Sequence, residues 1–140
     1  MEMIVADASV AAKWYVVEQH TPAAMRLLHP RYEIHAPDLL FIEMDNVLCT
    51  WMRAGGIDHA TADTIRTALR SVPINLHPSL PLLDTAYVIA SDTHTSVYDA
   101  LYVALAAHLK AKVVTADRRL LDALAATPFS KQVVWVADLT

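Results

Sequence analysis

Short apolar runs alternate along the chain with longer stretches whose apolar residues recur at helical spacing. Residues 4–6 and 112–116 each centre on a brief apolar run that is typical of a buried strand. Between residues 39 and 51 the apolar positions instead follow one face of a helix. The pattern predicts strands at 4–6, 33–36, 74–76, 112–116 and 133–136, and helices at 9–17, from Thr21-Pro22, from Asp38 to Gly55-Gly56, and at 58–72, 79–90, 97–109 and 118–126.

This alternation predicts an α/β fold. We expect one domain over residues 1–140, in which helices flank both faces of a short central parallel sheet. The only two glycines, Gly55 and Gly56, stand together where one helix ends. The chain therefore has no G-x-G-x-x-G sequence and no glycine-rich phosphate loop, which excludes dinucleotide-binding and P-loop functions.

Composition narrows the class of protein further. With 55% apolar and 19% charged residues the chain is not disordered, and the apolar excess suggests that another chain covers part of its surface. The lone Cys49 can form neither an intrachain disulfide nor a zinc cluster. Residues 1–7 do not form a signal peptide, and the apolar run at 100–107 is far shorter than the roughly 20 residues that span a bilayer. We therefore expect a cytoplasmic protein with no membrane segment.

Two predicted strands end in an aspartate. Asp7 follows the strand at 4–6, and Asp117 follows the strand at 112–116. In an open parallel sheet, ligands bind beyond the carboxyl ends of the strands, so both side chains lie where a site is expected. Aspartate is also a favoured N-cap, and for either residue alone capping is the simpler interpretation.

Two further acids lie on predicted helices. Asp99 fits a capping box with Ser96, yet its helical neighbours are apolar and should be buried. Glu43 shares a helix stripe with Leu39 and Val47 on the side expected to face the core. A buried carboxylate there needs a partner. That partner is either an arginine or a bound ligand that the other acids contact as well.

These four acids can meet at one edge of the sheet. Clustered carboxylates raise one another's pKa unless a cation neutralises them, and a ligand set made only of oxygen favours Mg²⁺ or Mn²⁺ over zinc. The chain has 15 acidic and 11 basic residues, so the four acids account for the whole net charge of −4. Without them the remaining surface carries no net charge that would repel a polyanion, which is consistent with phosphodiester chemistry.

Four segments in order resemble the PIN-domain family, and within it the VapC-type toxins. They are residues 5–10 (VADASV), residues 36–40 (APDLL) leading to Glu43 and Asn46, residues 97–106 (VYDALYVALA) and residues 114–120 (VTADRRL). Residues 55–95 contain no motif that we can match, and this region leaves the choice of substrate open.

The resemblance implies a metal-dependent endoribonuclease that hydrolyses RNA. Asp7, Glu43, Asp99 and Asp117 match the family's acidic quartet, which would hold one or two Mg²⁺ or Mn²⁺ ions and activate a water molecule. Supporting polar positions match Ser9, Asn46 and Thr115. The resemblance further implies a homodimer that is inhibited by a small, VapB-like antitoxin.

Several other residues allow two interpretations. Arg118 and Arg119 follow the last acid and either contact RNA phosphates or form a solvated helix start. The aromatic stretch at 13–15 either stacks on an RNA base or belongs to the core or a dimer interface, and we favour the second.

Asp45, about 200° around the helix from Glu43, is expected to be solvated. The seven histidines lack metal-ligand spacing, and we expect ordinary surface or core roles for them.

Two other functional classes compete. A phosphatase of the haloacid dehalogenase type needs a second aspartate two residues after the first, where this chain has Ser9, and a receiver domain needs paired acids after its first strand. The stronger alternative is a catalytically silent PIN-like module that binds RNA or protein. Four carboxylates that destabilise the fold without metal count against such a module.

Overall fold

The computed structural model describes residues 1–139. Five parallel strands form one sheet in the order β3-β2-β1-β4-β5. The strands are β1 (Glu2–Ala6), β2 (Tyr32–Pro37), β3 (Ile74–His77), β4 (Lys112–Thr115) and β5 (Val133–Trp135). Each lies where an apolar run predicted it, with ends that differ by one residue or two.

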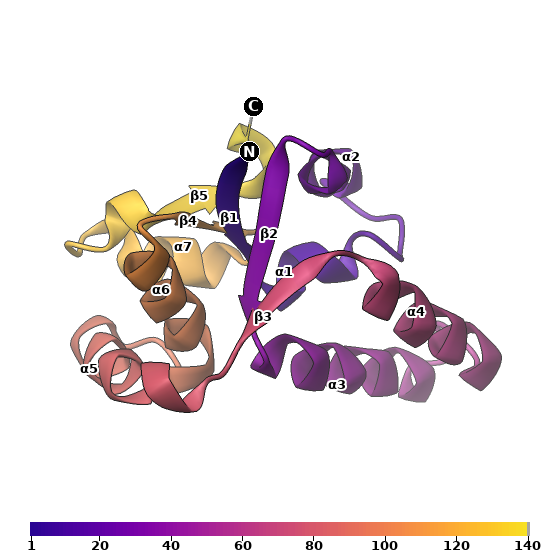
Figure 1. Ribbon diagram of the computed structural model, residues 1–140. Helices are drawn as coiled ribbons and strands as arrows, with labels where there is room; N and C mark the ends of the chain where they lie inside the picture. The colour runs from indigo at the N-terminus through magenta and orange to yellow at the C-terminus, as the bar shows by residue number, and fades with distance from the viewer. Residues whose placement is uncertain (140) are drawn as a thin grey trace.

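Helices cover both faces of this sheet, which confirms the predicted α/β fold. They are α1 (Ala8–Ala12), α2 (Thr21–Met25), α3 (Leu39–Arg53), α4 (His59–Ser71), α5 (Leu83–Thr93), α6 (Val97–Leu109) and α7 (Arg118–Ala125). Short 3₁₀ helices are η1 (Arg26–Leu28), η2 (Leu80–Leu82), η3 (Ser130–Gln132) and η4 (Val136–Asp138). Figure 1 shows α1 to α4 on one side of the sheet and α5 to α7 on the other.

The strand order reverses between β1 and β4. The chain adds β2 and then β3 on one side of β1, and afterwards returns to place β4 and β5 on the other side. The helices that follow β1 and β4 therefore leave the sheet toward opposite faces (Figure 1). Such a reversal opens a crevice beyond the carboxyl ends of the two strands, where α/β proteins bind their ligands.

The core lies along the two central strands and α6. Val5 of β1 and Val113 of β4 are wholly buried, and residues 100–106 of α6 are each at most 5% exposed. The apolar run that the sequence places here is thus a buried core helix. Across residues 1–139, no helix is long and apolar enough to cross a membrane.

Two predicted helices differ from the structure. The helix expected at 9–17 ends at Ala12, because the chain turns so that the buried Trp14 indole donates to the Ala24 carbonyl at 2.9 Å. The helix expected from Ser79 begins with η2 around Pro81, and α5 starts only at Leu83. Ser79 does not cap this helix, because its hydroxyl donates to Asp38 Oδ1 at 2.5 Å.

Glycine and capping signals were more reliable guides to helix ends. Gly55 follows α3 with a φ of +77°, a left-handed conformation that favours glycine. Ser96 caps α6 as expected, and its hydroxyl accepts from the Asp99 amide at 3.0 Å. The helix α2 begins at Thr21, where the Thr21-Pro22 pair predicted a helix start, but its N-cap is His20 and not Thr21 as that pair suggests.

Candidate active site at the carboxyl ends of β1 and β4

Asp7 is the most buried of the four acids. Its side chain is the N-cap of α1 and accepts from the Val10 amide at 3.1 Å. Ser9 Oγ donates to Asp7 Oδ1, and Thr115 Oγ1 donates to Asp7 Oδ2, both at 2.5 Å. Burial raises the pKa of Asp7 to about 6 even though these hydrogen bonds lower it, and the nearby charge of Asp99 raises it further.

Ser9 and Thr115 join the ends of the two central strands. Besides donating to Asp7, the Ser9 hydroxyl accepts from the Ala116 amide at 2.9 Å, and the Thr115 hydroxyl accepts from the Asp117 amide at 3.0 Å. Each hydroxyl therefore donates to Asp7 and accepts from a backbone amide of the segment that carries Asp117. Both residues position the acids, as expected of hydroxyls beside the cluster.

Glu43 is held by a tyrosine. Its Oε1 accepts from the Tyr102 hydroxyl at 2.6 Å, and Tyr102 itself is only 1% exposed. Burial and the charge of Asp99 raise the pKa of Glu43, whereas the tyrosine bond lowers it. Burial, above all, raises the pKa of Tyr102, and the charge of Glu43, the hydrogen bond to it and the charges of Asp7 and Asp99 raise it further. This phenol therefore lies among three of the acids.

Tyr102 is neither of the two partners considered for Glu43, and no arginine in the described chain pairs with this carboxylate. The predicted stripe on α3 was also wrong in part: Leu40, Met44 and Leu48 face the core, and Glu43 lies at its margin, half-buried. Sequence analysis missed the role of Tyr102. The available signal was its spacing of three residues from Asp99, which puts both side chains on one helix face.

Asp99 is electrostatically central to the cluster. Burial and the charge of Asp117 raise its pKa, and its own charge raises the pKa values of Asp7 and Glu43. Asp117 is the N-cap of α7 and accepts from the Arg119 amide at 3.0 Å. The structure therefore brings all four predicted acids into one region, where three of them also cap helices or sit in a first turn.

A polar pocket of about 350 Å³ opens beside Asp99 and Asp117. Arg119 also lines it, with Nε 3.8 Å from Asp117 Oδ1 and a side chain that is 94% exposed. Among residues 1–139, no lysine or arginine forms a salt bridge with Asp7, Glu43 or Asp99. Three of the four acids therefore have no basic side chain as an ion-pair partner in the described part of the chain.

The donor set fits a hard divalent ion. Besides the rings and chains of His94 and Arg119, the polar groups that line the pocket are two carboxylates, of Asp99 and Asp117, and two hydroxyls, of Thr95 and Ser96. These oxygens suit Mg²⁺ or Mn²⁺ rather than zinc. In the part of the chain that the structure describes, no three Asp, Glu, His or Cys side chains are close enough to hold an ion by themselves. Mg²⁺ does not need such a cage, since it usually keeps several waters and takes one or two carboxylates together with substrate phosphates.

The remaining predicted residues lie at the periphery. Asn46 is exposed one turn beyond Glu43. Arg118 lies over the Trp135 ring, with its guanidinium carbon 4.1 Å from the ring centroid, so it is not simply a solvated helix start. Asp45 pairs with Arg66 through two hydrogen bonds of 2.8 and 3.0 Å, and is therefore less free than expected. The preferred core assignment of Trp14 is supported by its burial.

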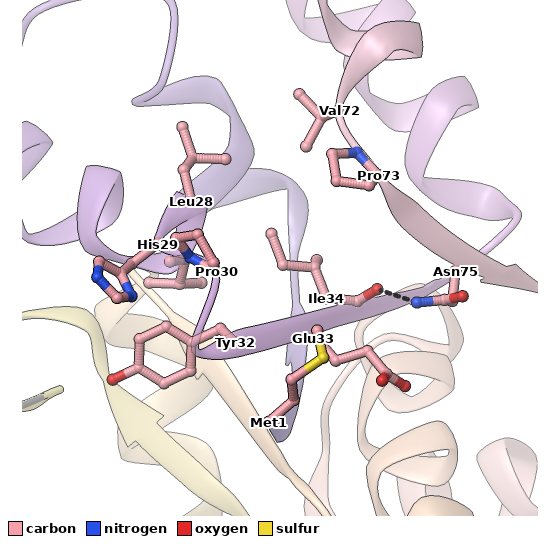
Figure 2. A pocket seen from close by; sticks show the side chains of 11 residues that line it. Met1, Leu28, His29, Pro30, Tyr32, Glu33, Ile34, Val72, Pro73 and Asn75 are labelled. Atoms are coloured by element: carbon pink, nitrogen blue, oxygen red, sulfur yellow. Dashed lines mark hydrogen bonds between the residues drawn. The ribbon is translucent and has the colours of Figure 1, made fainter.

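Two other features lie away from the acids. An apolar pocket of about 490 Å³ lies beside β2 and η1, where Leu28, Pro30 and Val72 line it and the Asn75 amide donates to the Ile34 carbonyl (Figure 2). Its one acidic side chain is Glu33, so it lacks the groups for phosphodiester chemistry.

The second feature is a pair of histidines that the sequence did not reveal. His35 Nδ1 lies 2.8 Å from His77 Nε2, and His35 Nε2 lies 2.7 Å from Glu33 Oε1. Burial, with the neighbouring His35 and His108, lowers the pKa of His77. The expectation that all histidines are ordinary was therefore too simple, because the register of β2 and β3 joins two that are 42 positions apart.

The fold and the acid cluster together define an α/β protein with four carboxylates at its topological switch point, and known proteins share the fold. The PIN-domain family model matches residues 4–126. Ribonuclease VapC3 from Pyrobaculum aerophilum is 32% identical over 121 residues, which cover 85% of this chain and 92% of that protein. This chain belongs to the PIN-domain family.

Solved structures agree on the fold. The crystal structure of PAE2754 from Pyrobaculum aerophilum superposes with a TM-score of 0.73 at 24% identity, covering 97% of this chain and 85% of that one. A toxin–antitoxin complex from Klebsiella pneumoniae gives a TM-score of 0.64 at 14% identity, covering 97% and 99%. At these identities the likeness establishes the fold.

Proposed function

We propose that this chain is a VapC-type endoribonuclease that hydrolyses RNA phosphodiester bonds at Asp7, Glu43, Asp99 and Asp117. The observation that carries the proposal is four acids gathered at the switch point, three of which (Asp7, Glu43 and Asp99) form no salt bridge among residues 1–139. The relationship to a protein named ribonuclease VapC3 supports the same activity.

The proposed cofactor is Mg²⁺ or Mn²⁺, held by Asp7, Asp99, Asp117 and Glu43. When bound, such an ion lowers the pKa of a coordinated water and neutralises charge on the phosphate. The protein's own residues orient the ligands: Ser9 and Thr115 fix Asp7, and Tyr102 fixes Glu43. Arg119, exposed on the rim of the pocket, provides a guanidinium for a substrate phosphate.

The proposed partners are a small antitoxin and a second copy of the chain. A related fold occurs in a toxin–antitoxin complex, which supports the antitoxin. Along η2 and α5, Leu80, Leu83 and Tyr87 are 78%, 40% and 67% exposed. An apolar surface of this kind supports a homodimer, since it would be costly to leave in water. We place the protein in the cytoplasm because its proposed RNA substrate is there.

The test is cleavage of total bacterial RNA by the purified chain, freed of any bound protein, with Mg²⁺, Mn²⁺ or EDTA. Asp7→Asn and Asp99→Asn should abolish cleavage, whereas the matched control Asp58→Asn, which alters an exposed N-cap aspartate on α4, should leave it intact. Discrete products that depend on the ion and on both acids are expected. Cleavage that survives in EDTA or in Asp99→Asn would contradict the proposed site.

A silent binding module is the second candidate. The absence of a ready-made three-ligand metal site among residues 1–139 favours it. Such a module would bind RNA or a protein partner but would neither cut RNA nor take up Mn²⁺. Calorimetric titration with Mn²⁺ distinguishes the two, because the nuclease should bind the ion and should lose that binding in Asp99→Asn.

A further inference from the structure

An arginine–tryptophan stack lies beside the acid cluster. Trp135 ends β5, and the Arg118 guanidinium carbon lies 4.1 Å from the centre of its ring. The His20 ring meets the same tryptophan edge-on, with centroids 5.4 Å apart and planes at 82°. Trp135 is half-buried and Arg118 is exposed, so the arginine is the side of this pair that faces water.

The strand register places this stack next to Asp7. Trp135 pairs with Thr115 across β4 and β5, and Thr115 donates directly to Asp7 Oδ2. Paired residues on adjacent strands project from the same face of a sheet, and adjacent strands are about 4.8 Å apart. Asp7, Thr115 and Trp135 therefore form one row along the carboxyl edge, with Arg118 directly after Asp117.

The Arg118–Trp135 pair is suited to binding a planar group rather than a carboxylate. Within residues 1–139, Arg118 forms no salt bridge to a carboxylate, whereas its neighbour Arg119 approaches Asp117. A guanidinium that lies on an aromatic ring is held flat, and its second face is open to a further planar group. Proteins recognise unstacked RNA bases by stacking them on aromatic rings and on arginine planes.

We propose that Arg118, placed over the Trp135 ring, is a stacking subsite for a nucleobase of the RNA next to the phosphate that is cut. The inference rests on the proposed nuclease function and adds where the substrate's base lies. It assigns different tasks to the two arginines: Arg119 faces the acidic pocket and a phosphate, and Arg118 takes a base. His20 is a positioning residue that fixes the tryptophan ring from its edge.

The test measures RNA binding in Asp99→Asn protein, in which cleavage is blocked. A labelled pool of single-stranded RNA of random sequence is the probe, and Arg118→Lys is introduced into this parent. Lysine keeps the charge but loses the plane, so binding should weaken about tenfold while its salt dependence stays the same. Arg70→Lys is the matched control, because Arg70 lies over Phe41 at 5.1 Å in another cation–π pair, and it should not change binding.

Two further comparisons separate stacking from charge and from folding. An abasic oligomer with the same number of phosphates should bind the parent and Arg118→Lys equally. Trp135→Leu should weaken binding of the RNA pool as Arg118→Lys does, whereas Trp135→Phe, which retains an aromatic plane, should keep most of it. The free energy of unfolding of each variant shows that the protein is folded in the assay.

The outcomes are distinct. If Arg118→Lys binds the RNA pool as tightly as its parent, the stacking subsite is refuted while the nuclease function stands. The same holds if its loss is equal on the abasic oligomer, because Arg118 then acts as a phosphate ligand. If the parent binds no RNA at all, both the nuclease function and the subsite fall.

Discussion

Asp7→Asn should make the metal-free protein more stable relative to the unmodified chain as the pH rises. The pKa of Asp7 is raised from 3.8 to about 6 in the folded state, chiefly by burial. The folded protein thus holds this proton more tightly than the unfolded chain does. The group's contribution to stability is fully present below about pH 3.8 and is lost as the pH rises through about 6.

The magnitude follows from these two pKa values. Each tenfold change in proton affinity is worth about 1.4 kcal/mol, so ionisation of Asp7 removes about 3 kcal/mol of folding free energy between pH 3 and pH 8. Roughly half of that, about 1.5 kcal/mol, is lost between pH 5 and pH 8. Asparagine stays neutral and can still accept from the Val10 amide and Ser9, so the variant escapes this pH-dependent loss. Its amide nitrogen cannot accept from Thr115, and this second effect is the same at every pH.

Urea unfolding in EDTA at pH 5, 6, 7 and 8 measures the effect. The stability of Asp7→Asn relative to the unmodified chain should increase by about 1.5 kcal/mol across this range. Asp58→Asn is the control: Asp58 is also an N-cap aspartate, but it is exposed and its hydrogen bonds to Thr61 lower its pKa. The Asp58 carboxylate is ionised in both the folded and the unfolded state above pH 5, so the stability of Asp58→Asn relative to the unmodified chain should not change with pH. A flat Asp7→Asn difference would refute the reasoning and mean that water reaches Asp7.

Three other predictions follow from the same contacts. Thr115→Val removes a donor to Asp7 and an acceptor for the Asp117 amide, so it should lower the free energy of unfolding by about 1–3 kcal/mol, measured in urea. A change below about 0.5 kcal/mol would contradict the stabilising role of these two hydrogen bonds. Tyr102→Phe removes the hydroxyl that holds Glu43, so the pKa of Glu43 should rise. RNA cleavage should become slower, and the acid limb of the pH–rate profile should move to higher pH. An unchanged profile would rule out this positioning role. Mn²⁺ should raise the melting temperature of the unmodified chain more at pH 8 than at pH 5, since the ion competes with protons for the acids. In Asp99→Asn the ion should raise the melting temperature only slightly. An equal rise in the unmodified chain and in Asp99→Asn would mean that the ion binds elsewhere.

Local signals in the sequence were enough to place most of the acids. Asp7 and Asp117 were found because apolar runs mark strands and a parallel sheet presents its ligands at the strand ends. The helix at Val97–Leu109 was predicted with its observed bounds because Ser96 caps it and its apolar run is continuous. These inferences needed nothing beyond neighbours a few residues apart.

Contacts between distant segments could not be predicted in this way. The Tyr102–Glu43 bond joins residues 59 positions apart and the His35–His77 pair joins residues 42 apart, so both depend on how helices and strands pack. The short α1 has the same origin, because a tertiary bond from Trp14 to Ala24 outweighs the local tendency to continue the helix. Arg118 was assigned two possible roles because its contact with Trp135 depends on the position of β5.

The bonds that Ser9 and Thr115 make across β1 and β4 have a consequence for synthesis of the chain on the ribosome. Thr115 lies 108 positions after Asp7, so the first strand and its aspartate are made long before the partner that orients them. Until β4 has been translated, β1 lacks a neighbour on one side, and the row of acids at the sheet edge is incomplete. A nascent chain therefore has no assembled acid cluster, and the proposed nuclease activity can arise only after β4 and Asp117 have been translated.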